Sequence, residues 1–253
     1  MNILVCVKTV PDDHARIALG EDGTPALGGV ATIVNAFDTY AVEMAVRFTE
    51  ENGGEVCVLS LGEEAQARPG VVQMISVGAK RGWIGPRTTG DESAVARTLS
   101  DCITALEQQG EVFDLILCGK ESSDKISSAV GAMLAEMLHR PFLSNLVELR
   151  QSGETLLGKQ ETEEGGDVYA LAMGSVVTVG KPTYDPRYPG LKAKMAARKA
   201  VIPLLEAAPA PSGTRHLGYK APPARQQGVK FAEKEVSESV EKALSALMGL
   251  RVL

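Results

Sequence analysis

Short apolar runs alternate with stretches of helical periodicity through the first 150 residues of the chain. The runs at Ile3–Val7, Glu55–Leu61 and Phe113–Cys118 are typical of strands that are buried on both faces. Helical spacing of apolar residues lies between and after them, at residues 41–48, 65–77, 91–109 and 127–138. Strands that alternate with helices predict an α/β fold, a three-layer sandwich with a mainly parallel sheet between two layers of helices.

Loop and cap residues set the expected limits of these elements. We expect Thr9–Val34 to be a loop because it is rich in glycine and proline. Asp38 and Asp91 are expected as helix N-caps, and Pro69 is expected in the first turn of its helix. Shorter strands are expected at residues 81–84 and 141–149.

The pattern changes after residue 150. Two strand-like stretches, Thr155–Gln160 and Val168–Met173, flank a turn and predict a β-hairpin. The remaining expected elements are a strand at 175–179, an irregular proline-rich stretch at 181–189, a basic helix at 191–199, an extended stretch at 203–223 and an amphipathic helix at 237–248. We therefore expect an α/β domain over residues 1–200. The remainder, residues 201–253, is expected to be an arm that wraps a partner subunit or packs back on its own domain.

Composition limits the classes of function. A net charge of −6 over 253 residues argues against nucleic acid or an anionic membrane as the main partner. The chain shows neither a signal peptide nor an apolar run of membrane-spanning length. Its cysteines form no CxxC pair and are expected to be small buried hydrophobic residues, at positions 6, 57, 102 and 118. We expect a cytoplasmic protein without a metal site, a nucleic-acid partner or membrane insertion.

The segment Cys118–Gly131 is the main candidate for a binding site. It follows a strand and precedes a helix, whose first turn offers free backbone N–H groups and a partial positive charge to a phosphate. Ser127 and Ser128 add hydroxyl donors. Two other strands end in small or polar residues, at Cys6–Thr9 and Ser60–Gly62, and ligands of parallel sheets bind beyond such ends. A plain connection with a serine N-cap is the alternative.

Four motifs within the first 205 residues occur in the same order as in one known family. They are Val5–Asp12, Asn35–Asp38 with Ala41–Glu43 behind it, Cys118–Gly131, and Asp185–Leu191 continuing to Met195. The predicted hairpin lies between the last two. Together they resemble the opening strand, the helix start, the nucleotide-binding loop and the partner-recognition loop of electron transfer flavoprotein β-subunits.

The resemblance implies a nucleotide at the strand ends of an adenine-nucleotide α-hydrolase-like sheet. In single-flavin members of the family this nucleotide is AMP, and in electron-bifurcating members it is a second FAD. The other FAD is shared with an α-subunit. Carried over position by position, the residues around the nucleotide are Cys6, Asn35, Ala36, Phe37, Asp38, Leu61, Gly119, Lys120, Ser122, Asp124, Lys125, Ser127, Ser128, Ala129 and Val130.

The resemblance also implies an electron carrier that works as a heterodimer with an α-subunit. Electrons would pass from an acyl-CoA dehydrogenase or a similar flavoenzyme to a quinone reductase, flavodoxin or ferredoxin. The flavin does this chemistry, so we expect no catalytic residue in this chain, and NADH-dependent activity only if a second FAD is bound. The residues expected to dock the dehydrogenase are Arg187, Tyr188, Leu191 and Met195.

Departures from the family pattern leave the nucleotide open between AMP and FAD. Lys125 replaces an Asp or Gly of many relatives, and its charge either strengthens anion binding or points to solvent. The segment Asp91–Ser93 lacks hydroxyls that would touch a second flavin. The motif Val10–Asp12, in contrast, resembles the bifurcating members.

Several of these residues have an ordinary structural role as their alternative. Asn35 is expected either to contact the base or ribose or to belong to the helix cap region, and Asp124 either to contact the ligand or to cap a helix. Leu191 is either a docking anchor or part of the core. Arg187 and Tyr188 either orient the docking segment or simply hold their loop. The basic run after them is either a solvated face or a surface that steers acidic partners.

A second class of function shares the expected sheet. An adenine-nucleotide-binding regulatory module of the universal stress protein type would bind a nucleotide at the same strand ends. Such a module lacks the C-terminal arm and the proline-rich segment at 181–189, so both features favour the electron carrier. A purified carrier heterodimer is expected to be yellow, and a stress-type module colourless.

Overall fold

The computed structural model describes residues 1–88, 90–223, 227–250 and 252. The chain divides into two compact units. The first, here called the α/β domain, comprises Met1–Ala18 and Pro25–Leu217. The second comprises Leu19–Thr24 and Gly218–Leu253. Each unit is described by itself.

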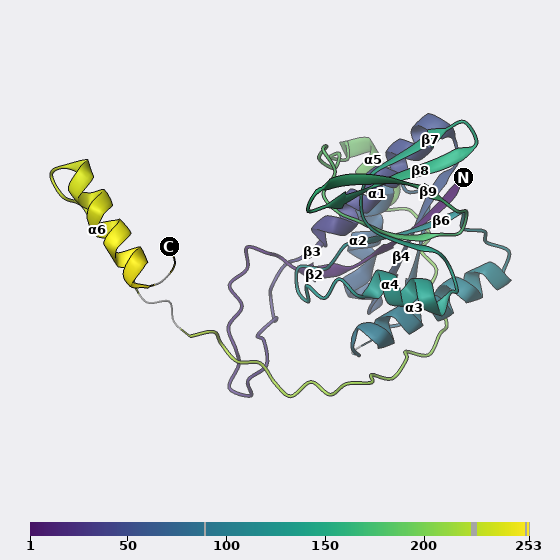
Figure 1. Ribbon diagram of the computed structural model, residues 1–253. Coiled ribbons are helices and arrows are strands. Elements are labelled where there is room, and N and C mark those ends of the chain that lie inside the picture. Colours follow the sequence, from purple (N-terminus) through teal and green to yellow (C-terminus); the bar gives the residue numbers. More distant parts are fainter. Residues whose placement is uncertain (89, 224–226, 251, 253) are drawn as a thin grey trace. The chain divides into compact units, whose positions relative to one another are not determined.

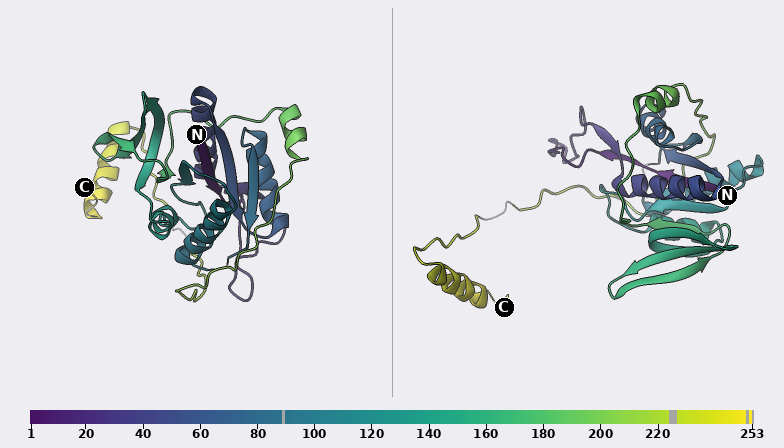
Figure 2. Two further views of the ribbon diagram at one scale, coloured as in Figure 1. Left: turned by 90° about the vertical axis from the view of Figure 1, so that its right-hand side faces the viewer. Right: turned by 90° about the horizontal axis from the view of Figure 1, so that it is seen from above.

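Eight strands form one sheet within the described part of the α/β domain, in the order β5-β4-β1-β6-β10-β7-β8-β9 (Figures 1 and 2). Neighbouring strands from β5 to β7 are parallel, and β8 and β9 extend the sheet as an antiparallel hairpin. The strands are β1 (Asn2–Val7), β4 (Glu55–Leu61), β5 (Arg81–Gly85), β6 (Leu115–Gly119), β7 (Phe142–Ser152), β8 (Thr155–Thr162), β9 (Gly165–Leu171) and β10 (Val176–Val179). The predicted mainly parallel sheet and hairpin are thus confirmed.

Helices cover both faces of the sheet. The helices are α1 (Ala36–Asn52), α2 (Glu64–Ser76), α3 (Glu92–Gln108) and α4 (Val130–Met137). Ile3 and Val5 of β1 pack with buried residues of α1 and α2, whereas Leu4 and Cys6 pack with those of α3 and α4. Since successive side chains of a strand point to opposite faces, this alternation confirms the three-layer sandwich.

Four expectations about local structure are wrong. Thr9–Val34 is not all loop, because β2 (Thr9–Pro11) and β3 (Thr32–Val34) pair antiparallel. Asp38 is not an N-cap: α1 begins after Asn35, and the Asp38 carboxylate accepts bonds from distant backbone amides.

The other two errors concern helix starts. Pro69 lies inside α2 and not in its first turn, because the buried face of Ala67, Val71 and Met74 continues through it. The helix expected from residue 127 begins only at Val130, because Ser128 has a φ of 52°, which α-helical backbone does not adopt. Asp91, as expected, caps α3 and accepts a bond from the Ala94 N–H at 3.0 Å.

The chain after β10 first crosses the α/β domain. The stretch 181–190 has no helix or strand, and α5 (Leu191–Ala197) follows and packs on α2. Beyond it, Leu204 forms a parallel bridge with Ile84 of β5. The Ala210 N–H donates to the buried Thr98 hydroxyl of α3 at 3.0 Å. This part of the predicted arm therefore packs on its own domain.

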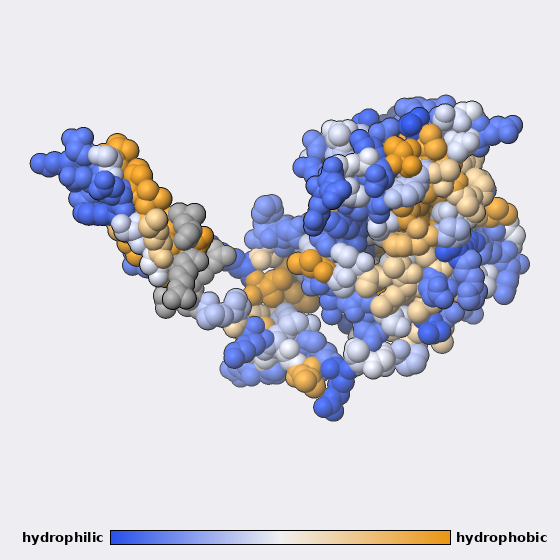
Figure 3. Space-filling view, in the orientation of Figure 1, coloured by the Kyte–Doolittle hydropathy of each residue, from blue (hydrophilic) through white to orange (hydrophobic). Residues whose placement is uncertain are grey.

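The second unit contains α6 (Val236–Gly249). Its apolar stripe, Val240, Leu244 and Leu247, is 37–49% exposed, and Figure 3 shows this stripe along one side of the helix. The predicted amphipathic helix is thus present. Residues 224–226, 251 and 253 of the predicted arm lie outside the described residues. No helix in the described ranges is long and apolar enough to span a membrane.

Candidate nucleotide site

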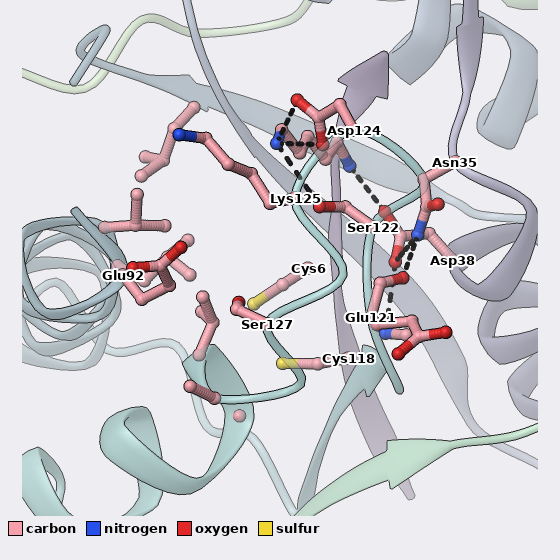
Figure 4. Close-up of a pocket in the computed structure, with 18 of the residues that line it drawn as sticks. Cys6, Asn35, Asp38, Glu92, Cys118, Glu121, Ser122, Asp124, Lys125 and Ser127 are labelled. Carbon is pink, nitrogen blue, oxygen red and sulfur yellow. Dashed lines mark hydrogen bonds and ion pairs between the residues drawn. The ribbon is translucent and has the colours of Figure 1, made fainter. Parts of the chain in front are cut away.

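A cavity of about 340 Å³ opens where the strand order reverses, beyond the carboxyl ends of β1 and β6 (Figure 4). The chain leaves β1 toward β4 on one side of it, while β6 and β10 lie on the other. Loops that depart in opposite directions leave a crevice, the usual ligand position of an open parallel sheet. The cavity has the size of a small-molecule site.

Most of the residues expected around a nucleotide line this cavity. They are Cys6, Asn35, Asp38, Leu61, Gly119, Lys120, Ser122, Asp124, Lys125, Ser127, Ser128, Ala129 and Val130. Ala36 and Phe37 are not among the lining residues. Ala36 is exposed, and the Phe37 ring lies 6.4 Å from that of Tyr40.

A second wall of the cavity was not among the predicted binding residues, although the sequence analysis compared Asp91–Ser93 with a flavin-contacting segment of the family. It comes from the start of α3 and the turn before it, with Arg87, Thr88, Gly90, Asp91, Glu92, Val95 and Leu99. Further lining residues lie beside the expected ones, namely Val7, Lys8, Cys118, Glu121 and Gly131. One signal was available: Asp91 caps a helix that follows a parallel strand, so its first turn lies at the binding edge of the sheet.

Asp38 ties the ends of β1 and β6 to the first turn of α1. Its carboxylate accepts bonds from the Lys8 N–H at 2.7 Å and the Gly119 N–H at 3.1 Å. The Asn35 amide donates a third bond at 3.0 Å. Burial outweighs these bonds and raises the pKa of Asp38 to about 7.

Asn35 holds the loop that follows β6. Its side-chain amide also donates to the Glu121 carbonyl at 2.8 Å, and its oxygen accepts the Ser123 N–H at 3.2 Å. The side chain is buried at 1% exposure, and both of its polar atoms are bonded to protein. Asn35 therefore fixes the backbone of the loop after β6 through its hydrogen bonds to Glu121 and Ser123.

The end of this loop forms a cradle of backbone amides, here Ser127–Gly131. Ile126 and Ser128 have left-handed φ angles of 53° and 52°, which turn the backbone before α4. The first intrahelical bond is donated by Met133 N–H to the Ala129 carbonyl, so the N–H groups of the preceding first turn have no partner within the helix. No serine caps α4: its N-cap is Ala129, and Ser128 donates to Glu121 at 2.7 Å. The serine-cap alternative is therefore wrong.

Four basic side chains line the cavity, Lys8, Arg87, Lys120 and Lys125. Lys8 forms an ion pair with Asp124 at 2.6 Å, and this lysine together with Ser122 lowers the pKa of Asp124 against the opposing effect of burial. Lys120, Lys125 and Arg87 form no ion pair within the described parts of the chain. Figure 4 shows the Lys125 side chain extending from the loop toward the α3 wall. This leaves positive charge for an anion in the cavity that the amide cradle also lines.

Two thiols form the floor of the cavity. Cys6 and Cys118 are register neighbours on β1 and β6, and both are buried. The hydrogen bond with Cys118 and the burial of the group raise the pKa of the Cys6 thiol well above its ordinary value. The prediction of small buried cysteines is confirmed at all four positions.

The expected docking residues lie on the stretch 181–190 and on α5. Tyr188 is 97% exposed, Leu191 76% and Met195 58%, so Leu191 is not a core residue. The Arg187 side chain is instead directed toward the domain, where it forms ion pairs with Glu43 and Glu50 of α1. The segment therefore presents apolar side chains outward while its arginine holds it to the domain.

Comparison with known proteins finds a family match and similar proteins along most of the chain. A family model described as the electron transfer flavoprotein domain matches residues 26–210. The electron transfer flavoprotein subunit beta of Syntrophomonas wolfei is 31% identical over 236 residues, which are 92% of this chain and 91% of that protein. The subunit beta of Megasphaera elsdenii is 30% identical over 271 residues, covering 100% of both. The acryloyl-CoA reductase electron transfer subunit gamma of Anaerotignum propionicum is 31% identical over 192 residues, 74% of this chain and 71% of that protein.

Proposed function

Because the chain belongs to the electron transfer flavoprotein family, as a β-subunit, we propose that its cavity holds the adenylate part of a nucleotide within a heterodimer with an α-subunit. The observation that carries this proposal is the convergence of the Ser127–Gly131 amide cradle and the Lys125 ammonium on one cavity. Either AMP or the adenylate half of a second FAD satisfies this donor set.

The lining residues fit such a ligand in two parts. The phosphate suits the cradle at the start of α4, because backbone N–H groups and the helix dipole stabilise an anion there. The Ser127 hydroxyl and Lys125 add donors to it. A planar base suits the apolar lining of Leu61, Val95 and Leu99.

The electron carrier of the complex is the FAD that we place mainly on the α-subunit. That flavin supplies the redox chemistry when it is bound. The residues of this chain bind and orient: Asp38 and Asn35 fix the loop, and the cradle holds the phosphate. No side chain of the cavity is assigned a covalent role.

The dehydrogenase is proposed to dock on the exposed segment Tyr188–Met195. Its apolar side chains, Leu191 and Met195, stand beside Lys192 and Lys194, which are also exposed. An apolar anchor in a basic surround suits a partner with a pocket and an acidic rim, such as an acyl-CoA dehydrogenase or a similar flavoenzyme. The Anaerotignum relative is named as an electron transfer subunit of acryloyl-CoA reductase, which supports a partner that acts on a CoA ester.

The regulatory module of the universal stress protein type is the weaker candidate. It accounts for the sheet and the cavity but not for the docking segment or for α6. The family match along residues 26–210 also favours the carrier.

The nucleotides released on denaturation test the proposal. The heterodimer is purified after coexpression with its α-subunit, denatured, and its AMP and FAD are counted per pair. We expect one FAD plus one further adenine nucleotide, which is AMP in a single-flavin carrier and FAD in a bifurcating one. A pair that releases only the shared FAD would show that this cavity holds no nucleotide.

A further inference from the structure

A buried carboxylate in the middle of α1 has no part in the nucleotide site. Glu43 is 2% exposed and lies within a run of core residues. Its two oxygens accept bonds from Arg47 Nε at 2.6 Å and from Arg187 at its backbone N–H (3.1 Å), Nε (2.8 Å) and Nη2 (3.2 Å). These arginines lower the pKa of Glu43 although burial opposes them, so the group is ionised at neutral pH.

The same face of α1 holds the segment at two further points. Glu50, seven residues or about two turns after Glu43, binds the far side of the Arg187 guanidinium at 2.6 and 2.8 Å. Between these acids, Arg47 stacks on the Tyr184 ring with 4.2 Å from Cζ to the ring centroid. The helix thus binds the chain at residues 184 and 187, within a stretch that has no helix or strand of its own.

The anchored residues lie directly before the exposed docking side chains. Tyr188 follows Arg187, and Leu191 opens α5 three residues later. Pro186 and Pro189 flank Arg187 and Tyr188, and their fixed φ angles leave this short stretch few conformations. The direction in which Tyr188 points is therefore set by the position of Arg187, and the same anchor lies four residues before Leu191, whose helix α5 also packs on α2.

Stability alone is a poor explanation for this cluster. Burying an ion pair costs desolvation, and apolar residues of similar volume commonly stabilise a fold as well or better. What a carboxylate and a guanidinium add is direction, because the planar fork accepts few geometries. We propose that Glu43 is a positioning residue for partner docking, which fixes the segment Tyr188–Met195 through Arg187. This inference rests on the proposed function, in which that segment contacts the dehydrogenase.

Glu43→Gln in the complete heterodimer tests the inference with two readouts. The first is electron exchange with the flavin dehydrogenase that reduces the wild-type pair. We expect its KM for the heterodimer to rise about tenfold, as for the loss of one charged hydrogen bond, with kcat unchanged. The second is the rate of tryptic cleavage after Lys192 and Lys194, which needs no partner and is expected to rise severalfold as the segment loosens.

Three further variants distinguish the effect of the position of the docking segment from effects of the charge and of the stability of the cluster. Glu50→Gln removes the 57% exposed end of the same cluster and should change KM less than twofold. Arg187→Lys keeps the charge but loses the fork, so it should resemble Glu43→Gln. The double variant Glu43→Leu with Arg187→Met replaces the ion pair by apolar side chains, so it should stay folded and still show the raised KM.

The outcomes distinguish this inference from the docking proposal itself. If Leu191→Ala slows exchange but Glu43→Gln leaves both KM and tryptic cleavage at wild-type values, the positioning role is wrong. It is also wrong if Glu43→Gln speeds cleavage without raising KM, or if the stable double variant has a normal KM. If Leu191→Ala itself leaves exchange unchanged, the docking proposal fails, while faster cleavage in Glu43→Gln would still establish the anchor.

Discussion

At the scale of single residues, the tightest constraint in the cavity lies at Gly119, where β6 meets the first turn of α1. A Cβ placed there would lie 2.2 Å from Asp38 Oδ1 and 2.9 Å from the Asp38 backbone nitrogen. Glycine is thus required because the Asp38 carboxylate occupies the space in order to bond the Gly119 N–H. The motif that contains Gly119 is conspicuous in the sequence, but this reason for it depends on α1.

Gly119→Ala should displace Asp38 and open the floor of the cavity. We expect a loss of about 1–3 kcal/mol of unfolding free energy and less adenine nucleotide released per heterodimer. Urea unfolding and nucleotide counting measure the two effects. Gly28→Ala is the matched control, since a Cβ there meets no atom within 4 Å. Equal stability and nucleotide content in the two variants would contradict this account of Gly119.

The buried carboxyl of Asp38 should also make stability depend on pH. Its pKa is about 7 in the folded chain and about 4 when unfolded, so the folded state binds more protons between these values. Its contribution to stability is therefore present below pH ~4 and is lost as the pH rises toward 7. In Asp38→Asn this contribution is absent.

Unfolding free energies of wild type and Asp38→Asn, measured from pH 5 to 8, test whether the contribution of Asp38 to stability falls as the pH rises. The difference between wild type and variant should shrink as the pH rises and level off above pH ~7. A difference that stays constant, or that grows with pH, would mean that the three donors keep Asp38 ionised throughout.

At the scale of elements, the sequence predicted the limits of those strands that are buried on both faces. β1 and β4 lie within one residue of their predicted limits because burial on both faces leaves an unbroken apolar run. The short pair β2 and β3 was missed, since three-residue strands gain their hydrogen bonds only from a distant partner. The late start of α4 depends on a left-handed Ser128, which no local pattern indicates.

The candidate site likewise has a part that the sequence predicts and a part that depends on packing between distant elements. The loop after β6 follows from its position after a strand, and the family resemblance adds Asn35 and Asp38. Of the α3 wall, only the segment Asp91–Ser93 was considered, through the family resemblance, because the rest depends on which helices of the second layer lie next to each other, as α3 and α4 do here. Sequence patterns indicate the end of a strand more directly than the helix that will face it.

The element that carries the docking proposal is α5. Leu191→Ala should raise the KM of the dehydrogenase for the heterodimer about tenfold, since a buried interface anchor is typically worth 1–3 kcal/mol. Flavin and adenylate contents should stay at wild-type values, because Leu191 does not line the cavity. Stopped-flow reduction of the heterodimer measures the effect. Val201→Ala, at an 87% exposed position beyond α5, is the control. Equal reduction kinetics in both variants would contradict the role of Leu191 as a docking anchor.

At the scale of the whole molecule, α1 connects the cavity of the α/β domain with its proposed docking segment. Its first turn holds the cavity through Asn35 and Asp38, and its middle holds the docking segment through Glu43. Both parts of the helix use buried carboxylates that accept hydrogen bonds from backbone N–H groups of other parts of the chain. The helix therefore links the cavity to the proposed dehydrogenase surface.

The second unit has the features of a surface that needs a partner. Val240, Leu244 and Leu247 form an apolar stripe on α6 that remains exposed in the isolated chain. A helix with one apolar face gains most of its stability by burying that face against another element. In the proposed heterodimer, the α-subunit is the partner that covers it.

Leu244→Asp places a charge in the middle of this stripe and should weaken pairing with the α-subunit more than tenfold, because a buried leucine contributes about 1.5–3 kcal/mol. Ser245→Asp adds the same charge off the stripe and should pair normally. Truncation after Leu217 removes the helix, keeps the contacts of residues 204–212 with the α/β domain, and should abolish pairing. Co-purification with a tagged α-subunit measures all three. A truncated chain that is recovered at full yield would show that the α/β domain alone forms the heterodimer.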